Sequence, residues 1–160
     1  MPVRGPATDS TAAPADTTAP ALAAQPAPLE ILLVEDNPAD VRMMQEAVRV
    51  AGVDCRLHVV EDGLQAISFL CQTRQFSAAP RPHIVLLDLN VPKLNGHEVL
   101  SEIRSNDSLR DIPVVVLTSS RSVSDRQKSE HMKADRFMTK AAGLAACVEQ
   151  IKTIAALAKV

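Results

Sequence analysis

Residues 83–88 read HIVLLD, an apolar run that ends in an aspartate. A strand that helices cover on both faces reads as a continuous apolar run, so residues 83–87 are predicted to form a central strand of a parallel sheet. An earlier apolar run at residues 29–34 ends in the acidic pair Glu35-Asp36. Two strands that both end in carboxylates predict a sheet with several negative charges gathered at one edge.

The same order of strand and then helix recurs from Leu29 to the end of the chain. We expect strands at residues 29–34, 56–60, 83–87, 113–117 and 136–138, and helices that start at Pro38, at Gly63 (to 74), after Asn95-Gly96, at Val123 (to 132) and at Leu144 (to about 158). Five such units predict an α/β fold with a doubly wound, five-stranded parallel sheet. Ligand sites in such sheets lie beyond the carboxyl ends of the strands.

Two further polar residues follow predicted strands. Thr118 comes after the run 113–117, and Lys140 comes after Thr139. The edge that carries the acids would thus also carry a hydroxyl and an ammonium, a set that can bind a divalent cation and hold a phosphoryl group on a carboxylate. Each residue alone has an ordinary explanation as a helix cap or a surface charge. Their combination at consecutive strand ends favours a switch site.

Composition argues against several classes of protein. The 160 residues suffice for one domain with a substantial core, and the net charge of −2 argues against an electrostatic nucleic-acid binder. Every apolar run is shorter than the roughly 18 residues that would cross a bilayer. The three cysteines lack metal-ligand spacing, and their odd number fits a reduced, cytoplasmic location better than a disulfide framework.

Residues 1–28 differ from the rest of the chain. They are rich in Ala, Pro and Thr and have almost no large apolar side chain, so we expect a disordered tail in front of one folded domain at residues 29–160. Pro14, Pro20 and Pro26 interrupt any continuous apolar stretch, which argues against a signal peptide.

Three motifs carry a resemblance to a known family. Residues 33–37 (LVEDN), 86–92 (LLDLNVP) followed by Asn95-Gly96, and 115–120 (VVLTSS) resemble the response-regulator receiver domain. The resemblance extends from Leu29 to about Lys159 and implies the flavodoxin-like (βα)5 fold with strand order 2-1-3-4-5. Within the superfamily, RPH at 81–83 and IPVVVLT at 112–118 look like the single-domain regulators paired with cyanobacterial and bacterial phytochromes.

The resemblance implies a phosphoacceptor and a metal site. Asp88 would be the nucleophile that receives a phosphoryl group from a phosphohistidine and becomes an aspartyl phosphate. Asp36, Asp88 and the backbone carbonyl of Asn90 would bind Mg²⁺ directly, and Glu35 would act through water. Mg²⁺ suits such a set because it prefers hard oxygen ligands and keeps several waters.

The resemblance also implies how the site would signal. Lys140 would pair with a phosphoryl oxygen, Thr118 would donate a hydrogen bond to another, and Phe137 would be the aromatic switch residue that turns inward with Thr118. The protein would then be a single-domain response regulator of a two-component phosphorelay and not an enzyme. Its expected partners are a sensor histidine kinase, such as a phytochrome, and a second copy bound through the fourth helix, fifth strand and fifth helix, without nucleic acid or membrane.

Three departures from the family pattern are visible. Ala141 follows Lys140, where receivers usually have a proline joined by a cis bond, so we expect a trans or strained loop and a shifted Lys140. Residues 133–135 (KAD) replace a common Gly-Ala turn, which predicts a reshaped turn because left-handed backbone is less accessible without glycine. Phe137 stands where Tyr is also common, and it offers no hydroxyl to a partner.

Two alternatives stay open from the sequence. The missing proline after Lys140 is compatible with a receiver-like interaction module that no longer depends on phosphate. A haloacid-dehalogenase-type phosphohydrolase also uses a strand-end Asp, a Thr and a Lys, but it places a second Asp two residues after its nucleophile. This chain has Asn90 at that position, so it resembles that enzyme class less.

Overall fold

The structure is a computed structural model that describes residues 27–158, so residues 1–26 of the predicted tail and the last two residues lie outside it. Its elements are β1 (Leu29–Val34), α2 (Pro38–Ala51), β2 (Cys55–Val60), α3 (Gly63–Cys71), the short 3-10 helix η1 (Arg74–Phe76), β3 (Ile84–Leu87), α4 (Gly96–Ser105), β4 (Val114–Thr118), α5 (Val123–His131), β5 (Arg136–Thr139) and α6 (Leu144–Ala158). None of these helices is long and apolar enough to cross a membrane.

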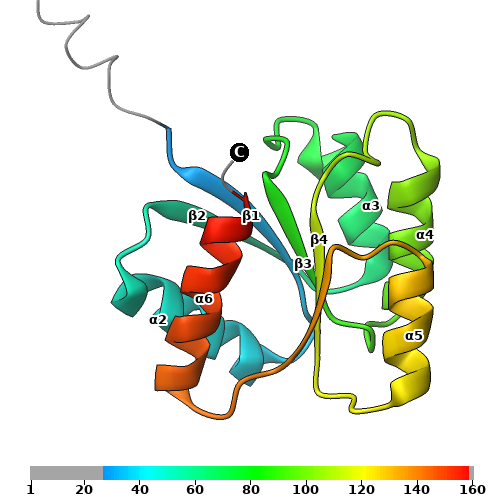
Figure 1. Cartoon of the computed structure of the whole chain (residues 1–160). Coiled ribbons are helices and arrows are strands. Elements are labelled where there is room, and N and C mark those ends of the chain that lie inside the picture. Colours follow the sequence, from blue (N-terminus) through cyan, green and yellow to red (C-terminus); the bar gives the residue numbers. More distant parts are fainter. Residues whose placement is uncertain (1–26, 159–160) are drawn as a thin grey trace, which may run out of the picture.

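The five strands form one parallel sheet in the order β2-β1-β3-β4-β5. Helices α2 and α6 cover one face, and α3, α4 and α5 cover the other (Figure 1). The predicted α/β class, doubly wound arrangement and strand order are therefore confirmed. The order in which strands are added reverses between β1 and β3, since β2 lies on one side of β1 and β3, β4 and β5 lie on the other. Ligands bind at such a switch point in folds of this type.

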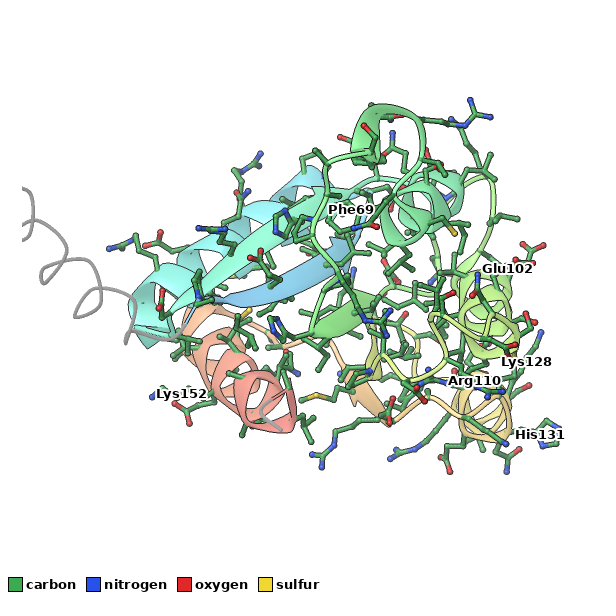
Figure 2. The ribbon with its side chains drawn as sticks, turned by 90° about the horizontal axis from the view of Figure 1, so that it is seen from above. Phe69, Glu102, Arg110, Lys128, His131 and Lys152 are labelled. Carbon is green, nitrogen blue, oxygen red and sulfur yellow. The ribbon has the colours of Figure 1, made fainter. Side chains whose placement is uncertain are left out.

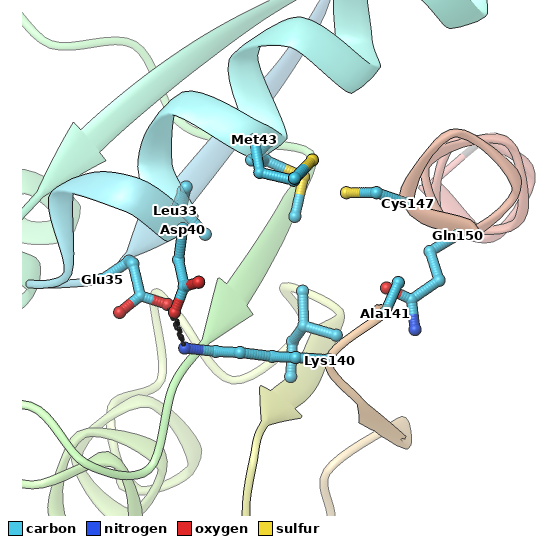
Figure 3. A pocket seen from close by; sticks show the side chains of 10 residues that line it. Leu33, Glu35, Asp40, Met43, Lys140, Ala141, Cys147 and Gln150 are labelled. Carbon is cyan, nitrogen blue, oxygen red and sulfur yellow. Dashed lines mark hydrogen bonds and ion pairs between the residues drawn. The ribbon is translucent and has the colours of Figure 1, made fainter. Parts of the chain in front are cut away.

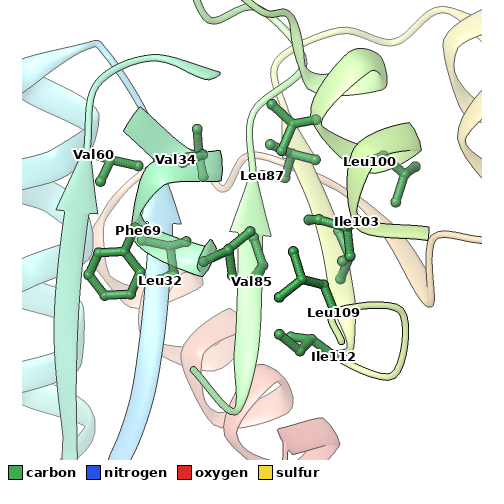
Figure 4. Packing of buried hydrophobic residues seen from close by; sticks show 14 of the residues in the cluster. Leu32, Val34, Val60, Phe69, Val85, Leu87, Leu100, Ile103, Leu109 and Ile112 are labelled. Atoms are coloured by element: carbon green, nitrogen blue, oxygen red, sulfur yellow. The ribbon is translucent and has the colours of Figure 1, made fainter. Parts of the chain in front are cut away.

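Side chains that alternate along β1 fill both halves of the core. Ile31 and Leu33 pack with α2 and α6, whereas Leu32 and Val34 pack with α3 and α4. Figure 4 shows the second of these clusters, in which the β1 side chains lie near Phe69 of α3. All four residues of β3 are fully buried, which confirms its predicted central place and explains why it is apolar throughout.

Charged residues of the helices lie on the outside of these layers. Figure 2 shows Glu102, Lys128 and Lys152 pointing away from the sheet, whereas Phe69 lies inside. The buried faces of α2, α3, α4 and α6 are mainly apolar, whereas α5 buries only Ser129. The buried charged residues in the described part of the chain are Glu30, Glu35, Asp62 and Asp88.

Asparagine side chains cap the two helices that follow the acidic strand ends, directly after Asp36 in one case and after the loop 89–94 in the other. The side chain of Asn37 accepts hydrogen bonds from the N–H groups of Ala39 (2.9 Å) and Asp40 (3.3 Å), and Pro38 occupies the first turn of α2. Asn95 and Glu98 form a reciprocal capping box at the start of α4, with both bonds 3.0 Å long. These caps satisfy N–H groups that a helix cannot pair internally, so the chain turns promptly into each helix.

Helix α3 is shorter than predicted. It ends at Cys71 because Gln72 adopts left-handed backbone (φ 56°), and the N–H of Thr73 donates to the carbonyl of Ser68 at 2.9 Å. Residues 74–76 then form a separate 3-10 turn. No glycine marks this end, and the predicted helix to residue 74 is therefore wrong in its last turn.

The turn after α5 adopts left-handed backbone although it contains no glycine. Lys133 has φ 68°, its N–H donates to the carbonyl of Glu130, and the N–H of Ala134 donates to the carbonyl of Ser129, both at 3.0 Å. These bonds close the helix in the way that a glycine cap usually does. The expectation that residues 133–135 would reshape the turn is wrong.

Arg104, at the end of α4, supports this turn. Its guanidinium donates to the carbonyls of Lys133 (2.9 Å), Ile112 (2.9 Å) and Arg110 (3.0 Å) and to the carboxylate of Asp135 (2.7 Å). One side chain therefore joins the end of α4, the loop before β4 and the turn before β5, and these bonds help to hold Lys133 in its unusual conformation.

Gly96 lets α4 approach the loop that carries Asp88. Its N–H donates to the carbonyl of Leu89 at 3.0 Å. A Cβ atom at residue 96 would lie 2.6 Å from the carbonyl oxygen of Asp88 and 2.6 Å from the Cα of Leu89. Both neighbours are backbone atoms, so they cannot move aside as a flexible side chain would.

We predict that Gly96→Ala destabilises the fold by about 1–3 kcal/mol, since it forces an extra methyl group against backbone. Urea denaturation measures this change. Ser101→Ala on the exposed face of the same helix is the control and should change the free energy of unfolding by less than about 0.5 kcal/mol. Equal stabilities of the two variants would contradict the close approach at Gly96.

Candidate functional site

Three acids meet at the carboxyl edge of the sheet. Glu35 and Asp36 follow β1, and Asp88 follows β3, its neighbour in the sheet. One carboxylate oxygen from each residue lies within 4.8 Å of the other two. Glu35 and Asp88 are buried, whereas Asp36 is exposed. The cluster is thus open to solvent on one side and enclosed by protein on the other.

Lys140 enters this cluster from the end of β5. Its Nζ lies 2.5 Å from Glu35 Oε1, 2.7 Å from Asp40 Oδ2 and 3.0 Å from Asp88 Oδ2. An ammonium has three N–H donors, and three carboxylates compete for them here. The backbone N–H of Lys140 donates to the carbonyl of Thr118 at 2.9 Å, which ties the start of its loop to the neighbouring strand.

The crowded charges shift two pKa values. Burial lowers the pKa of the Lys140 ammonium, but its contacts with Asp40, Glu35 and Asp88 raise it by more, so the net shift is upward. Burial raises the pKa of the Glu35 carboxyl, the hydrogen bond from Lys140 lowers it in part, and the charge of Asp88 raises it again. Lys140 is therefore held in its charged form, and the acids beside it carry more negative charge than one ammonium neutralises.

Both oxygens of the Asp88 carboxylate accept a hydrogen bond. The N–H of Asn90 donates to Oδ1 at 3.1 Å, and Lys140 donates to Oδ2 at 3.0 Å. The backbone N–H of Asp88 also continues the sheet by donating to the carbonyl of Val34 at 3.1 Å. These bonds fix the orientation of the carboxylate at the end of β3.

The three acids fit a hard divalent cation. Carboxylate oxygens are the ligands that Mg²⁺ prefers, and the exposure of Asp36 leaves room for the waters that this ion keeps. Within residues 27–158 no other group of three or more acids, histidines or cysteines meets the same spacing. The predicted role of the Asn90 carbonyl as a further ligand stays a prediction.

Thr118 and Phe137 lie on the neighbouring strands β4 and β5. Thr118 is fully buried, and its hydroxyl oxygen accepts a hydrogen bond from the N–H of Ser120 at 3.2 Å. Phe137 is half-buried, and the guanidinium carbon of Arg126 on α5 lies 5.6 Å from its ring centre. The structure places Thr118 at the site edge and Phe137 beneath α5.

The comparison with known families decides what this arrangement is. The sequence model of the response regulator receiver domain matches residues 31–152. The chain belongs to the response regulator receiver domain family. The resemblance found in the motifs around Asp36, Asp88 and Thr118 is confirmed.

Several known receiver proteins are similar along most of the chain. Response regulator Rcp1 of Synechocystis sp. (strain ATCC 27184 / PCC 6803 / Kazusa) is 44% identical over 117 residues, which are 73% of this chain and 80% of that protein. The crystal structure of the phosphorylated cyanobacterial phytochrome response regulator RcpA matches with a TM-score of 0.75 at 41% identity, over 80% of this chain and 91% of that one. The Mn²⁺-bound form of Rcp1 matches with a TM-score of 0.73 at 42% identity, over 79% and 91%.

Lys140 reaches the acid cluster although Ala141 follows it in place of the usual proline, and the expected shift of Lys140 stays a prediction. No cis peptide bond occurs among the described residues, so the bond between Lys140 and Ala141 is trans, as expected. The ammonium nevertheless reaches Asp88 at 3.0 Å. Ala141 packs against the core beside α2 and α6, so the loop is held by packing.

Asp40 is the site residue that the sequence did not reveal. It lies in the first turn of α2, and its carboxylate faces Lys140 at one side of a pocket that Met43 and Cys147 also line (Figure 3). An acid in a first turn is ordinarily explained by the helix dipole. The signal that could have found it is geometric, because side chains in a helix point back toward its N-terminus, which here is the acidic edge.

We predict that Mg²⁺ stabilises the protein, because it relieves repulsion among Glu35, Asp36 and Asp88. The gain is about 2.7 kcal/mol when the free ion reaches a hundredfold excess over its dissociation constant. Thermal melting with and without the ion measures it, and Asp36→Asn should lose most of the gain. Asp107→Asn removes an exposed acid from the opposite edge of the sheet and should keep the full response. A melting temperature that ignores Mg²⁺ would contradict the metal site.

Proposed function

We propose that this protein is a phosphorylation-dependent response regulator that accepts a phosphoryl group on Asp88 from a sensor histidine kinase. The observation that carries the proposal is the position of Asp88. It is a buried carboxylate 3.0 Å from an ammonium, and it also lies within the acid cluster that fits a divalent cation. A carboxylate nucleophile is already deprotonated and needs no general base. It needs nearby positive charge, which stabilises the negative oxygens of the transferring phosphoryl group.

The chain's own residues account for the transfer. An oxygen of Asp88 forms a bond to phosphorus while the bond between phosphorus and the donor imidazole nitrogen breaks, and that nitrogen keeps the electron pair. Lys140 donates to a phosphoryl oxygen and stabilises the charge that it carries. Mg²⁺, when held by Asp36, Asp88 and Asn90, supplies further neutralisation of the negative oxygens.

The relatives support a phytochrome as the source of the phosphoryl group. RcpA is described as a phosphorylated cyanobacterial phytochrome response regulator, and bacteriophytochrome response regulators match with 36–38% identity. The Mn²⁺-bound form of Rcp1 supports a divalent cation at the matching acids. We therefore propose a phytochrome-type histidine kinase as partner and, for the phosphorylated state, a homodimer through α5, β5 and α6.

The switch begins at Thr118. Its hydroxyl donates to the new phosphoryl oxygens, and Phe137 turns inward and leaves the guanidinium of Arg126. The surface of α5 changes with that movement. The phosphoryl group must interact more favourably with this second arrangement than with the first. A group that interacted equally with both arrangements would not shift the equilibrium between them.

We predict that Asp88→Asn abolishes phosphorylation and leaves the fold intact. The amide keeps the size of the carboxylate but removes the nucleophilic charge. Incubation with Mg²⁺ and acetyl phosphate, followed by intact mass, should show one phosphoryl adduct on the wild type and none on this variant. The control Asp107→Asn should label normally.

The other outcomes of this experiment separate the alternatives. Absence of any adduct on the wild type would favour an interaction module that does not depend on phosphate. Turnover of added phosphate esters would favour a phosphohydrolase. Equal labelling of the wild type and Asp88→Asn would place the phosphoryl group on a different residue.

We predict that Thr118→Ala still accepts the phosphoryl group but no longer transmits it. Amide hydrogen exchange of residues 123–137 should change on phosphorylation of the wild type and stay unchanged in the variant. Thr139→Ala is a matched control, because Thr139 pairs with Thr118 across the two strands but its side chain is exposed. A normal exchange response in Thr118→Ala would show that the signal leaves the site by another path.

A further inference from the structure

Asp40 is the third partner of the site lysine and lies on a different element from the other two. Its Oδ2 accepts a hydrogen bond from Lys140 Nζ at 2.7 Å. The Asp40 side chain is 42% exposed, whereas those of Glu35 and Asp88 are 4% and 7% exposed. Figure 3 shows the side chain of Lys140 extended, with its terminal ammonium at the carboxylate of Asp40.

Ala141, directly after Lys140, packs against the core beside α2 and α6, but this contact fixes the backbone and not the ammonium. Residues 141–143 are Ala-Ala-Gly, and Gly143 has φ 95°. On the strand side, Gln150 of α6 donates to the carbonyl of Thr139 at 2.6 Å, so the chain is held up to Lys140. The ammonium lies four methylene groups farther on, and its place depends on the carboxylates around it.

We infer that Asp40 is a positioning residue for Lys140, holding the ammonium at the phosphoacceptor in a chain that lacks the usual proline after the lysine. The inference rests on the proposed function, because it concerns the same site. It adds a residue of α2 to the set on which phosphorylation depends.

The three carboxylates that pair with Lys140 have different further roles, and Asp40 differs from the other two. Glu35 and Asp88 belong to the acid cluster that fits a cation, whereas Asp40 does not. Asp88 is also the residue that becomes an acyl phosphate, and its hydrogen bond from Lys140 then passes to a phosphoryl oxygen. Asp40 alone among the three has neither duty, so it can keep its bond to Nζ from the resting state to the phosphorylated state.

The test is the rate of phosphorylation by acetyl phosphate at saturating Mg²⁺, measured by intact mass. Asp40→Asn keeps the shape of the side chain and removes its charge, and the partial exposure of Asp40 lets this variant fold. We expect labelling to slow about two- to fivefold, as for the loss of a well-aligned, partly exposed ion pair. Glu46→Gln is the matched control, since Glu46 is an exposed acid of the same helix that pairs with Arg49, and it should label at the wild-type rate.

A double-mutant cycle separates positioning from a general structural effect. In a Lys140→Met background, Asp40→Asn should cause no further slowing, because the group that it positions is gone. Equal slowing in both backgrounds would overturn the inference, and so would an Asp40→Asn variant that labels as fast as the wild type or faster. A wild type that takes no label would instead overturn the proposed function, so the two failures are distinguishable.

Discussion

Repulsion among carboxylates at one edge of the sheet is the constraint on which the rest of this structure depends. Glu35, Asp36 and Asp88 lie close enough to bind one cation. The ammonium of Lys140 pairs with Glu35, Asp88 and also Asp40, so one positive charge serves three carboxylates. Like charges at this distance destabilise each other and favour any added positive charge. The fold therefore holds these acids together at a cost in free energy. A bound cation would relieve that repulsion, so part of the cost would appear as affinity for the cation.

The scaffold makes that arrangement rigid by ordinary means. A fully apolar β3 delivers Asp88 to the edge, and both oxygens of its carboxylate are held by hydrogen bonds. Asn37 caps α2 directly after Glu35-Asp36, and Asn95 caps α4 at the end of the loop that begins at Asp88. Gly96 lets α4 contact the backbone of Asp88 and Leu89 closely. Local rules of capping and close packing thus set the geometry of the charges.

Much of this could be read from the sequence, and the exceptions have physical causes. β1 and α6 were predicted with their observed bounds because their apolar patterns are strong and their ends are well marked. The end of α3 and the turn at Lys133 were missed because both use left-handed backbone without glycine. Asp40 was missed because its role depends on a lysine one hundred residues away. The site residues that follow strand ends were found since parallel strands place their carboxyl ends together.

The bonds of Arg104 have a mechanical consequence for α5. They hold the turn at Lys133 and Asp135, directly after the C-terminal end of that helix. The N-terminal end follows the loop of Ser120 and Ser122. In this loop Ser120 donates its N–H to the Thr118 hydroxyl, and the hydroxyl of Ser122 caps the first turn of α5. The C-terminal end of α5 is thus anchored to α4 through one guanidinium. Any tilt of α5 about that anchored end would displace its first turn the most, and the side chain of Val123 is exposed there.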